Sequence, residues 1–147
     1  MPLHETRVTA VFATDEQAPS CSLPLAVASV SAGFPSPADD YLEGVLDLNQ
    51  HLIKHPAATF FVRVTGDSMI DAGIHDGDLL LVDRSLEMVD GKVVIAIINA
   101  ELLVKRVRKV GARLFLLPEN QAYKPIEVQE NMDFELWGVV TYVIHSL

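Results

Sequence analysis

One serine, Ser68, stands where an apolar, strand-like run stops at a glycine, a placement typical of a nucleophile presented on a turn. The run is Phe60–Thr65, and Gly66 and Asp67 separate it from the serine. Serine is a poor nucleophile unless a nearby base takes its proton, so this interpretation depends on finding that base elsewhere in the chain. We expect the base to be Lys105.

Lys105 lies in the middle of Glu101–Val110, a charged run with the alternation of a strand. Alternation places Lys105 between Leu103 and Val107 on a face that can be buried. A general base must be neutral when it acts, and burial without a carboxylate partner can supply the roughly 3 to 5 kcal/mol that this requires of a lysine. Glu101, the nearest acid on that face, belongs at the outer end of the strand. We therefore expect Lys105 to be buried without an acidic partner.

Spacing alone leaves plainer interpretations open, because a serine and a lysine share no local signature. Ser68 can be a turn serine that caps Met69 and Ile70, and Lys105 can be one of four cations on a solvated strand. A Ser/His/Asp set would draw on three residues in predicted turns, where solvated positions are more common: His55, His75 and Asp76. The other histidines are too dispersed for a metal-site pattern: His4, His51 and His145.

Composition predicts one compact domain in a reducing compartment. The 147 residues are 50% hydrophobic and 21% charged, which is typical of a globular chain. Twenty acidic against 11 basic residues give a net charge of -9, which argues against a broad DNA-backbone surface and for protein partners. Cys21 is the lone cysteine, so no internal disulfide forms. No apolar run reaches the roughly 18 residues of a membrane span, and we expect a cytoplasmic protein.

The periodicity predicts a mainly β domain with short helices at its start. The helices are expected at about Pro37–Val45, capped by Ser36, and at Leu48–Lys54, capped by Asp47. Seven strands follow: Thr59–Val64, Leu79–Asp83, Lys92–Ile98, Glu101–Val110, Arg113–Leu117, Ile126–Val128 and Phe134–Ile144. Asn99-Ala100 is a good position for a hairpin turn. The last strand can be a dimer edge or, at least as well, a buried core strand.

Residues 1–32 differ from the rest, because no helical or strand period persists there. Scattered prolines and a run of small residues predict an extended arm. Short strand pieces are possible at Val8–Phe12 and Leu25–Val30.

Several motifs, in order along the chain, resemble those of one family, the LexA-like self-cleaving serine peptidases. Within that family the sequence resembles the UmuD-like proteins of SOS mutagenesis. The resemblance covers about residues 32–142. Its motifs are Gly33–Ala38, Asp47–Gln50, His55-Pro56, Gly66–Asp71, Asp76–Leu80, Val104-Lys105 and Trp137–Val140. Several motifs in order at consistent spacing are far more specific than a serine and a lysine. The resemblance implies a LexA/signal-peptidase-like β fold.

The resemblance also implies roles for individual residues. Ser68 matches the nucleophile and Lys105 the base, and the scissile bond falls on Ala32-Gly33. UmuD-like proteins typically carry cysteine before that glycine, whereas Ala-Gly is typical of the LexA repressors. The products would be an arm of residues 1–32 and a peptidase core of residues 33–147. Backbone N–H groups around Gly66, Ser68 and Met69 would stabilise the oxyanion, with no metal or cofactor.

The partners implied by the resemblance are a RecA filament on single-stranded DNA as the trigger, a second copy of the chain, and a UmuC-like Y-family polymerase. A repressor would need an N-terminal DNA-binding domain and a signal peptidase a membrane anchor, and we expect neither here. A non-enzymatic alternative stays open, in which the same fold serves as a dimeric polymerase-binding module without cleavage.

Overall fold

The computed structural model describes residues 4–18, 22–26 and 42–147. It divides into two compact units, one formed by Met1–Thr14 with Ala57–Leu147 and the other by Asp15–Pro56. The predicted boundary between Ala32 and Gly33 lies outside the described residues and stays a prediction.

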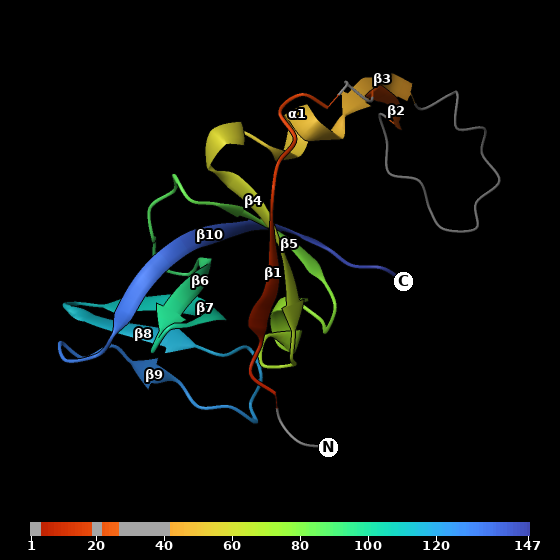
Figure 1. Cartoon of the computed structure of the whole chain (residues 1–147). Helices are drawn as coiled ribbons and strands as arrows, with labels where there is room; N and C mark the ends of the chain where they lie inside the picture. Colours follow the sequence, from red (N-terminus) through yellow and green to blue (C-terminus); the bar gives the residue numbers. More distant parts are fainter. Residues whose placement is uncertain (1–3, 19–21, 27–41) are drawn as a thin grey trace. The chain divides into compact units, whose positions relative to one another are not determined.

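The larger unit is built on an eight-stranded antiparallel sheet (Figure 1). Its strands are β1 (Arg7–Ala13), β4 (Thr59–Thr65), β5 (Leu79–Asp83), β6 (Val93–Ile98), β7 (Glu101–Val110), β8 (Arg113–Leu117), β9 (Ile126–Glu127) and β10 (Phe134–Ile144). The spatial order is β1-β4-β5-β10-β6-β7-β8-β9. A further pairing of Arg7 with Leu103 joins β1 to β7, so six of the strands close into a ring.

The seven strands expected after Thr59 are confirmed, four of them with the same bounds, and β1 confirms the strand piece expected at Val8–Phe12. The hairpin turn is confirmed as well, because Asn99 and Ala100 join β6 to β7 with φ of 50° and 66°. Positive φ at both central residues gives a turn whose twist matches that of the strands.

Buried apolar side chains form two clusters, which strand alternation places on opposite faces of β6 and β7. One cluster of fully buried side chains includes Val62, Leu80, Ile95 and Val104. A second lies around Val94, Val107 and Leu116, towards β8. Burial of this apolar surface is the main stabilising contribution to the sheet, and it fixes the register of β7.

β10 is an interior strand. Its first half, Phe134–Val139, pairs with β6, and its second half, Val139–Ile144, pairs with β5. Gly138 and Val139 are buried, whereas residues 142–144 are exposed, so the core strand is confirmed around the centre of this run. The alternative of a dimer edge stays a prediction. Among the helices that the structure describes, none is long and apolar enough to cross a membrane.

The smaller unit contains β2 (Ser22–Ala26), β3 (Leu42–Asp47) and α1 (Leu48–Leu52). Two single-turn 3-10 helices, Pro56–Ala58 and Ile70–Ala72, complete the described elements. The predicted cap of α1 is confirmed, because the Asp47 carboxylate accepts a hydrogen bond from the Asn49 N–H at 3.0 Å. The strand expected at Leu25–Val30 is confirmed only at Leu25 and Ala26, and residues 27–30 lie outside the described part.

The helix expected over Pro37–Val45 is wrong where the structure describes it. Leu42–Asp47 is a strand that pairs antiparallel with β2, from Asp47 opposite Ser22 to Leu42 opposite Ala26. A run this short fits either period, and the ladder with β2 satisfies backbone groups that a helix would have paired locally. Residues 37–41 lie outside the described part.

Candidate active site

Ser68 lies on the turn that ends β4, where the chain leaves the sheet. Gly66 makes the turn possible, because its φ of 107° is one that side-chain-bearing residues rarely adopt. Ser68 is completely buried. Its hydroxyl oxygen accepts a hydrogen bond from the Thr6 N–H at 2.8 Å, and its carbonyl accepts one from the Glu119 N–H at 2.8 Å.

Asp76 holds this turn in place. The Asp76 carboxylate accepts hydrogen bonds from the Thr65 hydroxyl at 2.6 Å and from the Gly66 N–H at 3.0 Å. The bond from Thr65, followed by that from Gly66, lowers the pKa of Asp76. The turn is therefore fixed at its glycine and at the residue before it.

The loop between β8 and β9 packs on the other side of the turn. The Asn120 side-chain amide donates to the Asp67 carbonyl at 2.9 Å, and the Tyr123 hydroxyl donates to the Asp67 carboxylate. Burial, and then the bond to Asp67, raises the pKa of Tyr123 to about 12. The phenol therefore stays a donor across the neutral and mildly alkaline range, and it helps to fix the backbone just before Ser68.

Lys105 lies on β7 and is completely buried, as the alternation of the strand predicted. The expectation that it has no acidic partner is wrong. Its ammonium nitrogen contacts the Glu5 carboxylate, whose side chain is 26% exposed. The two residues are 100 positions apart, so no local pattern indicates the pair. Glu101, the only acid considered from the sequence, is exposed at the end of the strand as expected.

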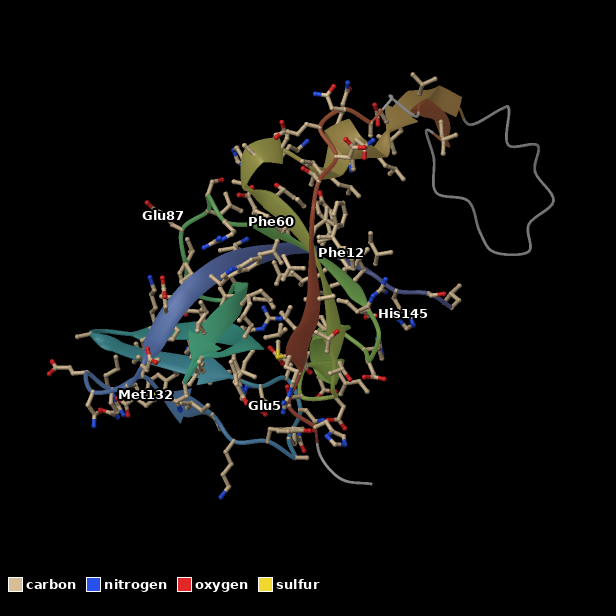
Figure 2. All side chains as sticks on the ribbon, viewed as in Figure 1. Glu5, Phe12, Phe60, Glu87, Met132 and His145 are labelled. Carbon is tan, nitrogen blue, oxygen red and sulfur yellow. The ribbon has the colours of Figure 1, made fainter. Side chains whose placement is uncertain are left out.

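The segment His4–Thr6 contacts both of these groups. It runs into β1, and Figure 2 shows Glu5 at the start of that strand. The His4 carbonyl accepts from the Asp67 N–H at 2.9 Å, and the Thr6 carbonyl accepts from the Val104 N–H at 3.0 Å. Consecutive residues, Glu5 and Thr6, thus contact Lys105 and Ser68 respectively.

The remaining predicted site residues are Gly66, Met69, Ala32 and Gly33. Gly66 faces the incoming segment, since a Cβ on it would lie 2.7 Å from the Glu5 carbonyl carbon and 2.7 Å from the His4 carbonyl oxygen. Met69 is fully buried in the core beneath the turn. The proposed cleavage residues, Ala32 and Gly33, lie outside the described residues.

Two of the residues considered for a Ser/His/Asp set, His75 and Asp76, make other contacts. His75 and Asp76 lie in the turn before β5, where Asp76 serves Thr65 and Gly66 as described. His75 groups with Asp78 and with His145, which follows β10.

The chain therefore combines a ring of antiparallel strands with a buried serine and a buried lysine, both contacted by one N-terminal segment. The peptidase S24-like family matches residues 24–141 of this chain. The chain belongs to this family, and the serine-peptidase class and mainly β fold predicted from the motifs are confirmed.

Curated relatives extend this likeness over most of the chain. Protein SamA of Salmonella typhimurium is 44% identical over 136 residues, covering 92% of this chain and 94% of SamA. Protein MucA of Escherichia coli is 45% identical over 127 residues, covering 86% of this chain and 84% of MucA. Protein ImpA of Shigella flexneri is 45% identical over 130 residues, covering 83% of each. The predicted UmuD-like relationship is confirmed at this level.

Proposed function

We propose that this chain is a self-cleaving serine peptidase of SOS mutagenesis, with Ser68 as nucleophile, Lys105 as base and the Ala32-Gly33 peptide bond as substrate. One observation carries the proposal. A single extended stretch of the chain's own N-terminal segment reaches Ser68 and Lys105 through two consecutive residues. A buried serine and a buried lysine that already bind one segment of their own chain are suited to cutting another.

In the proposed reaction, neutral Lys105 takes the hydroxyl proton of Ser68 while the oxygen attacks the Ala32 carbonyl carbon. Backbone N–H groups of the Gly66–Met69 turn stabilise the resulting oxyanion. Lys105 then returns the proton to the Gly33 nitrogen, the peptide bond breaks, and an ester joins Ser68 to Ala32. Water, deprotonated by Lys105, hydrolyses this ester and regenerates the serine.

The trimmed core would pair with a second copy and join a UmuC-like Y-family DNA polymerase in the cytoplasm. A RecA filament on single-stranded DNA would act as the trigger. The net charge of -9 supports this division of labour, because the partners rather than this chain would carry the DNA contacts. Size-exclusion chromatography with light scattering, on the chain before and after cleavage, tests the pairing.

The cleavage test uses the purified full chain at pH 10, without partners. Mass spectrometry should find two products, residues 1–32 and 33–147. Ser68→Ala and Lys105→Ala should each lower the rate at least about 1000-fold, because the nucleophile or its base is lost. Lys109→Ala, on the same face of β7, and Ser146→Ala are the matched controls and should cleave as the parent does. Equal cleavage by parent and Ser68→Ala would make the nucleophile assignment wrong.

A second candidate function is the non-cleaving, dimeric polymerase-binding module. It is favoured by the burial of Ser68 and by the ion pair that Lys105 makes with Glu5. In that case the full chain would form its dimer and bind the polymerase, and no cut after Ala32 would appear at any pH or with an activated RecA filament.

A further inference from the structure

We propose that His4–Thr6 is an internal competitor of the scissile segment. It contacts Ser68 and Lys105, which are completely buried, and must leave before the Ala32-Gly33 bond can reach them. This inference rests on the proposed function, which it extends to the regulation of the same site.

The first argument is occupancy. The segment binds in the extended form expected of a substrate, with backbone bonds from His4 to Asp67 and from Thr6 to Val104. Ser68 and Lys105 retain no exposed surface while it is bound. A second strand therefore cannot contact either group until the first departs.

The second argument is the hydrogen bond to the nucleophile. Thr6 directs its N–H at the Ser68 hydroxyl oxygen, 2.8 Å away. This bond engages an oxygen lone pair, and it points that lone pair at a peptide nitrogen rather than at a carbonyl carbon. The bound segment therefore does not present a carbonyl carbon to the Ser68 oxygen in a geometry suited to nucleophilic attack.

The third argument is charge. Lys105 must be neutral to accept a proton from Ser68, but the Glu5 carboxylate contacts its ammonium group. An opposite charge in contact favours the charged form of a lysine, which cannot act as a base. Glu5 thus opposes proton transfer from Ser68 to Lys105, and it also occupies space beside Lys105.

The fourth argument is that the fit is imperfect. The Thr6 hydroxyl oxygen is buried without a hydrogen-bond partner among the described residues. Burial of an unpaired hydroxyl is unfavourable, so the segment is held less tightly than its backbone bonds alone would hold it. A competitor bound in this way can be displaced by a better-fitting segment or by a partner protein.

The test compares the full-length parent with Glu5→Gln, which keeps the shape of the side chain and removes its charge. Glu101→Gln, on the exposed end of the same strand face as Lys105, is the matched control. Glu5→Gln should cut after Ala32 about 10-fold faster at pH 7, because the carboxylate that contacts the Lys105 ammonium group is removed. Glu101→Gln should match the parent.

Hydrogen exchange gives a second readout that does not depend on cleavage. In a Ser68→Ala background, the Asp67 and Val104 amides, which donate to the His4 and Thr6 carbonyls, should exchange faster when Glu5→Gln is added, while the β5–β10 amides do not change. Unchanged exchange at Asp67 and Val104, together with a Glu5→Gln rate equal to that of the parent, would overturn the proposed competition. Failure of the proposed function looks different, because no variant would then cut after Ala32 at any pH.

A separate observation carries a second inference: we propose that His75, Asp78 and His145 form a binding site for a divalent transition-metal ion such as zinc. The His145 Nδ1 lies 2.6 Å from one Asp78 oxygen, and the His75 Nδ1 lies 3.8 Å from the other. One potential ligand atom from each residue lies within 4.8 Å of the other two. Figure 2 marks His145 just beyond the end of β10.

The three side chains offer ligand atoms that suit such an ion, and the Asp78 side chain is buried. Imidazole nitrogens and a carboxylate oxygen are ligands that zinc accepts, with water completing the coordination. The Asp78 side chain is only 2% exposed, so its charge is held away from solvent. The His75 Nδ1 is itself buried without a hydrogen-bond partner among the described residues, as a nitrogen that can turn towards an ion would be.

Metal binding at this site would stabilise the turn that precedes β5. Asp78 accepts from the Val64 N–H at 3.1 Å through its backbone carbonyl, so the turn is already tied to the end of β4. Coordination by His145 would add a link to the C-terminal residues after β10. The expected role is therefore structural.

Isothermal titration of the full chain with zinc chloride should show one saturable site, and zinc should raise the melting temperature. His145→Ala should weaken binding at least about 10-fold, while His51→Ala, on the exposed helix α1, should bind as the parent does. Magnesium chloride should give no binding, because magnesium prefers oxygen ligands. An absence of saturable zinc binding, or equal binding by His145→Ala, would leave a simple His–Asp hydrogen-bond cluster and overturn the site.

Discussion

The two units of the molecule are built very differently. The larger unit closes six strands into a ring, and it buries Ser68 and Lys105 completely, together with two clusters of apolar side chains. The described part of the smaller unit is a two-stranded sheet followed by a five-residue helix with no buried residue. Val45 and Leu23 are 72% and 53% exposed there.

A two-stranded sheet on its own is only marginally stable, whereas a closed ring with a packed core is not. Ser68 and Lys105, the proposed nucleophile and base, both belong to the larger unit. The proposed scissile bond falls within residue numbers 15–56, which form the smaller unit. In the proposed reaction, this junction must reach Ser68 and Lys105 before it can be cut. Four further experiments test this difference between the two units.

The largest effect is expected from a change at the delivered bond. Gly33→Glu places a bulky, charged side chain beside the nucleophile and should lower the rate of cleavage after Ala32 at least about 100-fold, because the junction no longer fits beside Ser68. Mass spectrometry at pH 10 measures the rate. The melting temperature should stay that of the parent. Unchanged cleavage would relocate the scissile bond.

The contrast in packing predicts unequal costs for equal truncations. Leu80→Ala removes a fully buried core side chain and should lower the free energy of unfolding by about 3 kcal/mol, whereas Leu23→Ala, on half-exposed β2, should cost less than about 1 kcal/mol. Urea denaturation followed by tryptophan fluorescence measures both. Similar costs would contradict the difference between the units.

Raising the pH from 7 to 10 should increase the rate about 10-fold or more, because a larger fraction of lysine side chains is neutral. The raised pKa of Tyr123, about 12, means that folding favours its protonated form. Its contribution to stability is complete below the unfolded value near 10 and is lost as the pH rises through about 12. The turn should therefore survive the assay at pH 10. A rate that falls between pH 7 and pH 10, in a chain whose circular dichroism is unchanged, would argue against a lysine base.

The smallest effect is expected at the cap of α1. Asp47→Ala removes the bond to the Asn49 N–H and should destabilise this helix by about 1 kcal/mol. Hydrogen exchange of the α1 amides should report the change, while the β5–β10 amides stay protected. Parallel loss of protection in both places would mean that the two units unfold as one.

Much of the fold could be predicted from the sequence because its signals are local. Alternation in Glu101–Val110, turn residues between short runs and a capping aspartate each act over a few positions, and the structure confirms β7, the Asn99-Ala100 hairpin and the start of α1. The helix expected over Pro37–Val45 is wrong at Leu42–Val45 for the same reason. A run this short carries too little periodicity to outweigh a ladder with a distant strand.

The amino-acid sequence by itself determined the class of protein, the Ser68 turn and the buried face that carries Lys105, because strand period and glycine chemistry depend only on near neighbours. Tertiary structure alone decided what covers that site. Glu5 reaches Lys105 across 100 positions, and Thr6 reaches Ser68 across 62. Such contacts arise only when β1 closes the ring between β4 and β7, and no spacing along the chain encodes which acid a buried lysine will meet.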